Sequence, residues 1–153
     1  MDSKLKIIPV VLVLALFTLG LSNVSKAQQT NWSSSLMVIA NNIGTSKLTP
    51  VYVKSTFKGN YSLWSNGESV TIVLPSSKSA QAVDFASNVM GMSVSGMQKY
   101  WLSLVFQGRS NPPVFFESTN EIIQYVAKTS GAIAAIPANT EGVPGYLIIK
   151  IQN

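Results

Sequence analysis

Short apolar runs alternate with segments of helical periodicity along most of the chain. Residues 36–40, 69–74, 114–116, 132–136 and 146–151 have the apolar, β-branched character of buried strands. Helical spacing or helix-boundary residues mark the segments 50–57, 79–90, 95–106 and 118–128 between them. Because strands that alternate with helices join through right-handed crossovers, this order predicts an α/β fold. We therefore expect a central, mostly parallel sheet with flanking helices.

Residues with capping chemistry mark the predicted helix ends. Thr49 followed by Pro50 is typical of an N-cap and a first helical position, where the missing proline N–H costs nothing. Ser118, with Glu121 three residues later, has the spacing of a capping box. Three glycines follow helical segments and predict their C-terminal ends: Gly59, Gly108 and Gly131.

The first 27 residues have a different pattern, which is typical of a secretory signal peptide. Lys4 and Lys6 form a basic start, residues 7–17 form an apolar run, and Ser25-Lys26-Ala27 ends the segment with small residues at the positions that a signal peptidase reads. The run is shorter than the roughly 20 residues of a membrane-spanning helix, which disfavours an uncleaved anchor. We expect cleavage after Ala27, which leaves one domain over residues 28–153, periplasmic or secreted. Because the sequence has no cysteine, it is not a lipoprotein.

The composition narrows the chemistry that the chain can perform. Apolar residues make up 46% of the sequence and charged residues 11%, which suits a domain with a buried core. The formal net charge is +5, but the basic residues are dispersed, which disfavours nucleic acid as a partner. The lack of cysteine and histidine excludes thiol chemistry, Cys/His zinc sites and histidine triads. Since the six acidic residues form no close cluster in the sequence, we expect no metal ion and no cofactor.

A serine–lysine pair is the one catalytic arrangement that this composition leaves open. Three serines flank Lys78 within residues 76–79, but groups so close in sequence rarely face each other productively. We therefore expect a binding or docking protein rather than an enzyme.

Several short motifs follow one another in an order that is known from one protein family. They are Phe57-Lys58-Gly59, Trp64, Gly67, the predicted strand 70–74, Phe85, Tyr100-Trp101, Phe106-x-Gly108, Pro113 and Gly131-Ala132-Ile133-Ala134. Together they resemble the substrate-binding proteins of the phosphate ABC transporter family, over residues 35–151. Full-length members of that family have two α/β lobes that clasp an anion. Residues 28–153 suffice for one lobe, so the resemblance implies a single periplasmic-binding-protein-like lobe that does not close by hinge motion.

The stretch LPSSKSAQAVDF, residues 74–85, corresponds to the anion-binding motif of that family. The family motif is Arg-x-x-x-Ser-Gly-Thr-x-x-x-Phe at a helix start, and here Ser79 and Phe85 keep its serine and phenylalanine. Pro75 takes the arginine place, Ala80 the glycine place and Gln81 the threonine place. The planar double donor of the arginine is therefore lost, and Lys78 compensates only as a point charge.

Four residues remain as candidate anion ligands: Ser76, Ser77, Lys78 and Ser79. Hydroxyls, an ammonium group and the N–H groups of a helix start are the donors that an oxyanion prefers. The alternative is that one serine is an ordinary N-cap and the others belong to a loop. Arg109, which follows a predicted helix, is expected to be solvated at the surface or to interact with the C-terminus of that helix, rather than to contact a ligand.

Two functions follow from these alternatives. In the first, the chain is an exported solute-binding-like module that binds phosphate, sulfate or another small oxyanion weakly. In the second, it is a periplasmic protein-interaction module that keeps the scaffold, has lost the ligand site, and docks on an envelope protein or on a second copy of itself.

Overall fold

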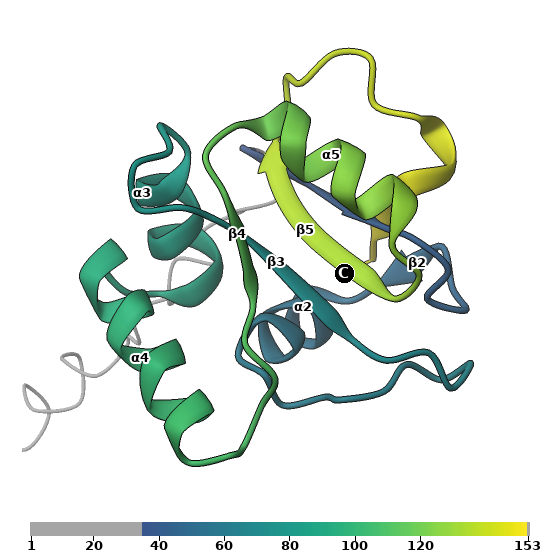
Figure 1. Ribbon diagram of the computed structural model, residues 1–153. Helices are drawn as coiled ribbons and strands as arrows, with labels where there is room; N and C mark the ends of the chain where they lie inside the picture. Colours follow the sequence, from purple (N-terminus) through teal and green to yellow (C-terminus); the bar gives the residue numbers. More distant parts are fainter. Residues whose placement is uncertain (1–34, 153) are drawn as a thin grey trace, which may run out of the picture. The chain divides into compact units, whose positions relative to one another are not determined.

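The structure is a computed structural model that describes residues 35–152 (Figure 1). The described part contains a six-stranded sheet with the strand order β2-β6-β1-β5-β3-β4. The strands are β1 (Leu36–Ala40), β2 (Lys47–Leu48), β3 (Thr71–Pro75), β4 (Val114–Phe116), β5 (Ala132–Pro137) and β6 (Ile148–Ile151). β2 and β4 are the two edge strands of this sheet.

The sheet is mixed but mostly parallel. β3 pairs in parallel with β4 and with β5, and β2 pairs in parallel with β6. β1 lies between β5 and β6 and is antiparallel to both, with Met37 opposite Ile136 and Val38 opposite Ile149. Only β1 is therefore reversed among the described strands. The expected α/β fold with a mostly parallel sheet and flanking helices is confirmed.

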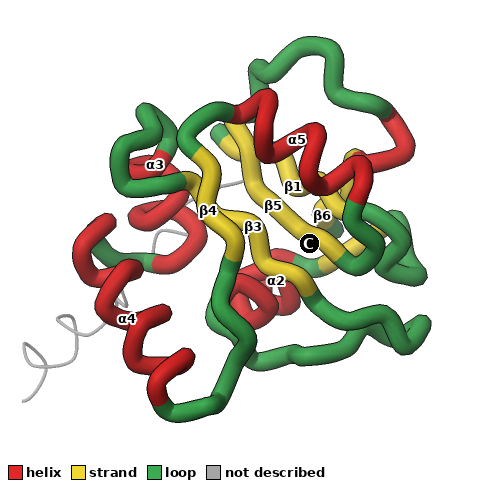
Figure 2. Tube along the Cα trace, in the orientation of Figure 1, coloured by secondary structure: helices red, strands yellow, loops and turns green. Residues whose placement is uncertain are grey.

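Helices cover both faces of the sheet (Figures 1 and 2). The helical elements are α2 (Pro50–Phe57), α3 (Ala82–Phe85), the π-helical turn η2 (Ala86–Met90), α4 (Val94–Phe106), α5 (Thr119–Lys128) and the 3₁₀ turn η3 (Gly145–Leu147). Side chains alternate between the faces of a strand. Ile72 and Leu74 of β3 accordingly belong to a core shared with α2, α3, η2 and α4, whereas Val73 belongs to a second core under α5 and η3.

Local chemistry fixes the helix ends that the sequence predicted. The Thr49 hydroxyl accepts a hydrogen bond from Tyr52 N at 3.2 Å, directly before Pro50 at the start of α2. The capping box of α5 is complete, because the Ser118 side chain accepts from Glu121 N and the Glu121 carboxylate accepts from Ser118 N. Gly131 has a φ of +75° between α5 and β5, and a Cβ at this position would overlap the backbone oxygen of Ser69.

Three sequence-based expectations are corrected. The helix predicted over residues 79–90 begins at Ala82 and ends as the π-helical turn η2, because residues 76–81 form side-chain-bonded turns. The strand predicted over 146–151 begins only at Ile148, after the 3₁₀ turn that follows Pro144. The short strand β2 was not predicted.

Candidate functional site

Two neighbouring parallel strands, β3 and β4, send their connections to opposite faces of the sheet. The connection after β3 leads to α3, in the core shared with α2 and α4, and the connection after β4 leads to α5 on the other face. In open α/β sheets, such a divergence leaves a crevice at the carboxyl ends of the two strands, where ligands bind. Here residues 76–81 follow β3 and residues 117–119 follow β4, and three interactions described below join these two segments. We use the name β3–β4 crevice for the place where they meet.

The four candidate anion ligands differ in their accessibility. Ser77 and Lys78 are exposed, Ser76 is half-buried and Ser79 is buried. The Ser76 hydroxyl accepts a hydrogen bond from Lys78 N at 3.3 Å, and the Ser79 hydroxyl accepts one from Gln81 N at 3.4 Å. Ser76 and Ser79 therefore shape the turn, and Ser77 and Lys78 project from it.

The predicted helix start at these serines is wrong. Gln81 is the N-cap residue of α3, and its side chain makes no capping hydrogen bond. Ser79 stands two residues before this cap, so it belongs to the preceding turn. The reason is local: serine hydroxyls that bond to nearby backbone N–H groups offer the chain an alternative to helical hydrogen bonds.

Three interactions join the two sides of the β3–β4 crevice. Ser76 N donates to the backbone oxygen of Phe116 at 2.7 Å, which continues the pairing of β3 with β4. Lys78 Nζ lies 3.7 Å from Glu117 Oε1, and both side chains are largely exposed. The Thr119 hydroxyl donates to Gln81 Oε1 at 3.4 Å. The structure thus brings together residues that are 38 to 40 positions apart in the sequence.

The side-chain nitrogen of Gln81 lacks a hydrogen-bond partner among the described residues, although the oxygen of the same amide accepts from Thr119. The Gln81 side chain is 7% exposed, and its Nε2 is buried without a hydrogen-bond acceptor among residues 35–152. A buried amide donor without an acceptor costs about 1–3 kcal/mol, so such groups mark places where a ligand or water supplies the acceptor. In the sequence, Gln81 is noticeable only because it occupies the threonine position of the family motif. No pattern of apolar residues around it predicts that its side chain is buried.

The charges around the crevice have both signs. Lys78 is paired with Glu117. At the start of α5, the Glu121 carboxylate accepts from Ser118 N at 3.1 Å and from the Ser118 hydroxyl at 2.8 Å. These hydrogen bonds lower the pKa of Glu121, so the carboxylate is ionised near neutral pH. The helix start of α5 therefore already holds an anion of the chain itself, and an added oxyanion would depend on the donors of the β3 side.

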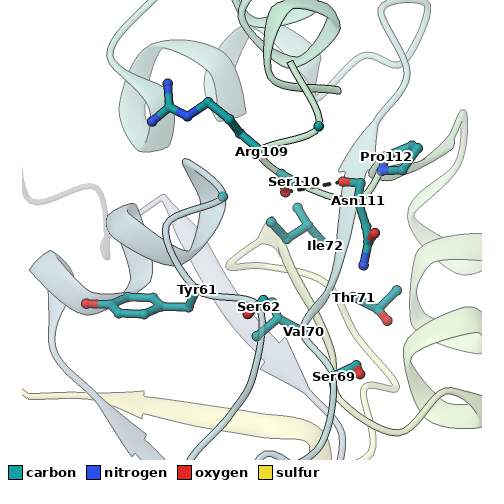
Figure 3. A pocket seen from close by; sticks show the side chains of 12 residues that line it. Tyr61, Ser62, Ser69, Val70, Thr71, Ile72, Arg109, Ser110, Asn111 and Pro112 are labelled. Carbon is teal, nitrogen blue, oxygen red and sulfur yellow. Dashed lines mark hydrogen bonds between the residues drawn. The ribbon is translucent and has the colours of Figure 1, made fainter. Parts of the chain in front are cut away.

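A cavity of about 390 Å³ lies at the other end of these two strands, beside the amino ends of β3 and β4. Figure 3 shows Ser62, Thr71, Ser110 and Asn111 around it, with the Arg109 side chain extending away from Asn111 and Thr71. Arg109 also belongs to the lining of this cavity, and its expected interaction with the end of α4 stays a prediction. This cavity holds none of the four candidate ligands.

No protein-family model matches the sequence, and neither does any curated protein. Among solved structures, the chain is similar to an ABC-type phosphate transport receptor from Vibrio cholerae, with a TM-score of 0.49 and 13% sequence identity. The similarity covers 76% of this chain and 46% of the receptor chain. The chain therefore spans less than half of the length of that receptor.

Within residues 35–152, no helix has the length and apolar character that a membrane crossing requires. The same residues contain no group of three or more histidine, cysteine, aspartate or glutamate side chains that could hold a metal ion. The predicted signal peptide lies outside the described residues.

Proposed function

We propose that the protein is an exported solute-binding module that takes a small oxyanion, such as phosphate or sulfate, in the β3–β4 crevice. The observation that carries this proposal is the buried amide of Gln81, whose Nε2 has no acceptor among the described residues. An oxyanion has acceptor oxygens on every side, so it matches this donor together with the hydroxyl of Ser77 and the ammonium group of Lys78.

The position of the crevice supports the same proposal. Ligands of open α/β sheets bind where adjacent connections diverge at the carboxyl ends of the strands. Ser76, Ser77, Lys78 and Ser79 all lie on the β3 side of that place, the first and last as turn residues and the middle two as exposed donors. No step of the proposal requires a cofactor, a metal ion or catalysis.

The ion pair between Lys78 and Glu117 sets the expected affinity. A bound oxyanion would replace the Glu117 carboxylate as the partner of Lys78, at a cost of breaking a 3.7 Å exposed pair. Exposed ion pairs contribute about 0–1 kcal/mol, so this replacement is feasible but leaves little net electrostatic gain. We therefore expect weak binding, without the bidentate clamp that an arginine would supply.

The test is calorimetric titration of the purified protein with phosphate and with sulfate at low ionic strength. Saturable heat that is lost in Lys78→Ala and kept in Lys150→Ala, an exposed lysine of β6, would support the proposal. Absence of heat at millimolar anion, or equal binding by Lys78→Ala, would refute it.

A further inference from the structure

Asparagine followed by glycine occurs once in the sequence, at Asn66-Gly67. This pair is chemically labile, because a glycine has no Cβ to hinder its backbone nitrogen from attacking the side-chain amide before it. In that reaction the Gly67 nitrogen loses its proton to solvent and bonds to Asn66 Cγ, while Nδ2 takes up a proton and leaves as ammonia. Water then opens the cyclic imide at either carbonyl, which leaves aspartate or isoaspartate at position 66.

In the fold, hydrogen bonds hold the groups that this reaction needs. Gly67 N donates to the Trp64 carbonyl at 3.0 Å, which closes a turn. Asn66 Nδ2 donates to the Asn42 carbonyl at 2.9 Å, and Asn66 Oδ1 accepts from Glu68 N at 3.2 Å. Cyclisation uses the Gly67 nitrogen and turns the Asn66 amide towards it, so these bonds have to break before the reaction can proceed.

The loop of residues 41–46, between β1 and β2, packs on the Asn66 side chain. Gly44 has a φ of +78°, and a Cβ at this position would lie 3.0 Å from Asn66 Cβ and 3.2 Å from Asn66 Cγ. Asn42 of the same loop has a φ of 50°, and its Nδ2 donates to Glu68 Oε1 at 3.2 Å and to Ser130 Oγ at 2.9 Å. The 41–46 loop therefore holds Asn66 in place, although Asn66 is exposed to water, the second reactant.

We propose that Asn66 is a site of spontaneous deamidation and that the 41–46 loop controls the reaction. While the loop is in place, the Asn66 amide is held away from cyclisation. When the loop lifts from the turn, Asn66 reacts with Gly67. Openings of surface segments cost less free energy than global unfolding, so the reaction does not require the whole domain to unfold. This inference is independent of the oxyanion site at the carboxyl end of β3.

The product of the reaction opposes the return of the loop. Deamidation replaces the Nδ2 donor of Asn66 by a carboxylate oxygen, which cannot share a hydrogen bond with the Asn42 carbonyl because both are acceptors. It also adds a negative charge near Glu68, whose carboxylate accepts from Asn42 Nδ2. The Asn66→Asp variant, which carries the aspartate product, is therefore expected to unfold at a lower temperature than the unchanged protein. Equal unfolding temperatures would refute this consequence.

The test follows the conversion of Asn66 by mass spectrometry in the purified protein, held in mildly alkaline buffer with and without guanidinium chloride. Trypsin releases residues 59–78 as one peptide, and fragmentation distinguishes Asn66 from Asn60 within it. We expect conversion in the folded protein to be at least about tenfold slower than in the denaturant, because hydrogen bonds must break first. Gly67→Ala in the denaturant checks the route, since the added Cβ should slow the attack.

Gly44→Ala tests the role of the 41–46 loop. The added Cβ would press on the Asn66 side chain, so we expect conversion in the folded protein to accelerate by about threefold to tenfold. The rate in guanidinium chloride should not change. Gly142→Ala is the matched control, because Gly142 has a similar φ of +73° and open space around the position of its Cβ.

Asn42→Gly is a second variant that the fold should tolerate better. Glycine accepts the left-handed conformation of this position and keeps the carbonyl that accepts from Asn66. The hydrogen bonds from Asn42 Nδ2 to Glu68 and Ser130 are lost, which loosens the loop. We expect conversion of Asn66 in the folded variant to accelerate by about threefold.

Three outcomes would overturn the inference. One is a lack of conversion at Asn66 in guanidinium chloride, because the pair would then not be a modification site. Another is an equal rate in the folded and the denatured protein, because the fold would then have no control over the reaction. The third is equal acceleration by Gly44→Ala and Gly142→Ala, which would assign the control to global stability. If Gly44→Ala does not fold, an unchanged rate in Asn42→Gly has the same meaning.

Discussion

Gln81 and Thr119 meet across the β3–β4 crevice, where the Thr119 hydroxyl donates to Gln81 Oε1 at 3.4 Å. This contact holds the oxygen of the amide against α5 and leaves Nε2 as a buried donor without an acceptor among the described residues. Nε2 would not have to break a hydrogen bond in order to donate to a ligand, but it is enclosed by the protein, so neighbouring groups would have to move before a ligand could reach it.

Replacing Gln81 by leucine should lower the affinity for phosphate without lowering the thermal stability of the protein. Gln81→Leu keeps a side chain of similar size and removes a buried amide that lacks one partner, so we expect thermal stability to be unchanged or raised. We expect phosphate affinity to fall by about tenfold, since a hydrogen bond to a charged group contributes about 1.5–3 kcal/mol. The measurements are thermal unfolding and calorimetric titration, with the exposed Gln124→Leu as control. Retained phosphate binding by Gln81→Leu would contradict the assigned role.

Removing the carboxylate that competes for Lys78 should strengthen anion binding. In Glu117→Gln the ammonium group of Lys78 loses its partner at 3.7 Å and becomes free for a ligand. We expect phosphate to bind about threefold more tightly at low salt, and the gain to shrink at high salt. Glu141→Gln, in an exposed loop after β5, controls for the change in net charge. An affinity gain of equal size in both variants would show that only the overall charge matters.

A Cβ at residue 131 should destabilise the fold strongly. Gly131 has a φ of +75°, its carbonyl accepts from Trp64 Nε1 at 2.8 Å, and an added Cβ would overlap the backbone oxygen of Ser69. We expect Gly131→Ala to lower the free energy of unfolding by about 3 kcal/mol or more, measured in urea.

Gly142→Ala is the matched control for that variant. Gly142 has a φ of +73°, but open space surrounds the position of its Cβ. We expect a loss of about 1–2 kcal/mol, which is the cost of the left-handed conformation alone. Equal losses in the two variants would show that the close approach of Ser69 has no energetic effect.

The capping box of α5 should make stability depend on pH in the acidic range. Hydrogen bonds from Ser118 hold the pKa of Glu121 below its usual value. A lowered folded-state pKa stabilises the fold above the unfolded-state pKa, and this stabilisation is lost as the pH falls through the folded-state pKa. We expect Glu121→Gln to unfold at a lower temperature than the unchanged protein at pH about 7, with the difference closing towards pH about 3. A difference that stays constant over this range would exclude the carboxylate as its cause.

The parts of the fold that could be predicted rest on local chemistry. Thr49 before Pro50, and Ser118 with Glu121, specify helix starts because all the groups involved lie within one turn. Residues 79–81 were predicted to open a helix that begins only at Ala82, because serines serve equally well as N-caps and as turn residues. β2 has two residues and pairs with β6 at the far end of the chain, so its own sequence carries no pattern.

The candidate site was predictable only on one side. The serines and Lys78 stand next to one another in the sequence, so their cluster is visible there. The partners Glu117 and Thr119 reach the crevice only because β4 pairs with β3 and α5 crosses to the other face. The burial of Gln81 depends on the same tertiary arrangement. Gln81 and Thr119 are 38 positions apart in the sequence, so nothing in the sequence around either residue indicates that they are in contact.

The most direct test of the oxyanion site is a nuclear magnetic resonance titration of the ¹⁵N-labelled protein with phosphate, in which the side-chain amide of Gln81 is followed. The account predicts a saturable shift of the Gln81 amide resonance, together with the backbone resonances of Ser77 and Lys78, and its absence in Lys78→Ala. A Gln81 amide that does not respond at phosphate concentrations that saturate other resonances, or no response anywhere, would contradict it.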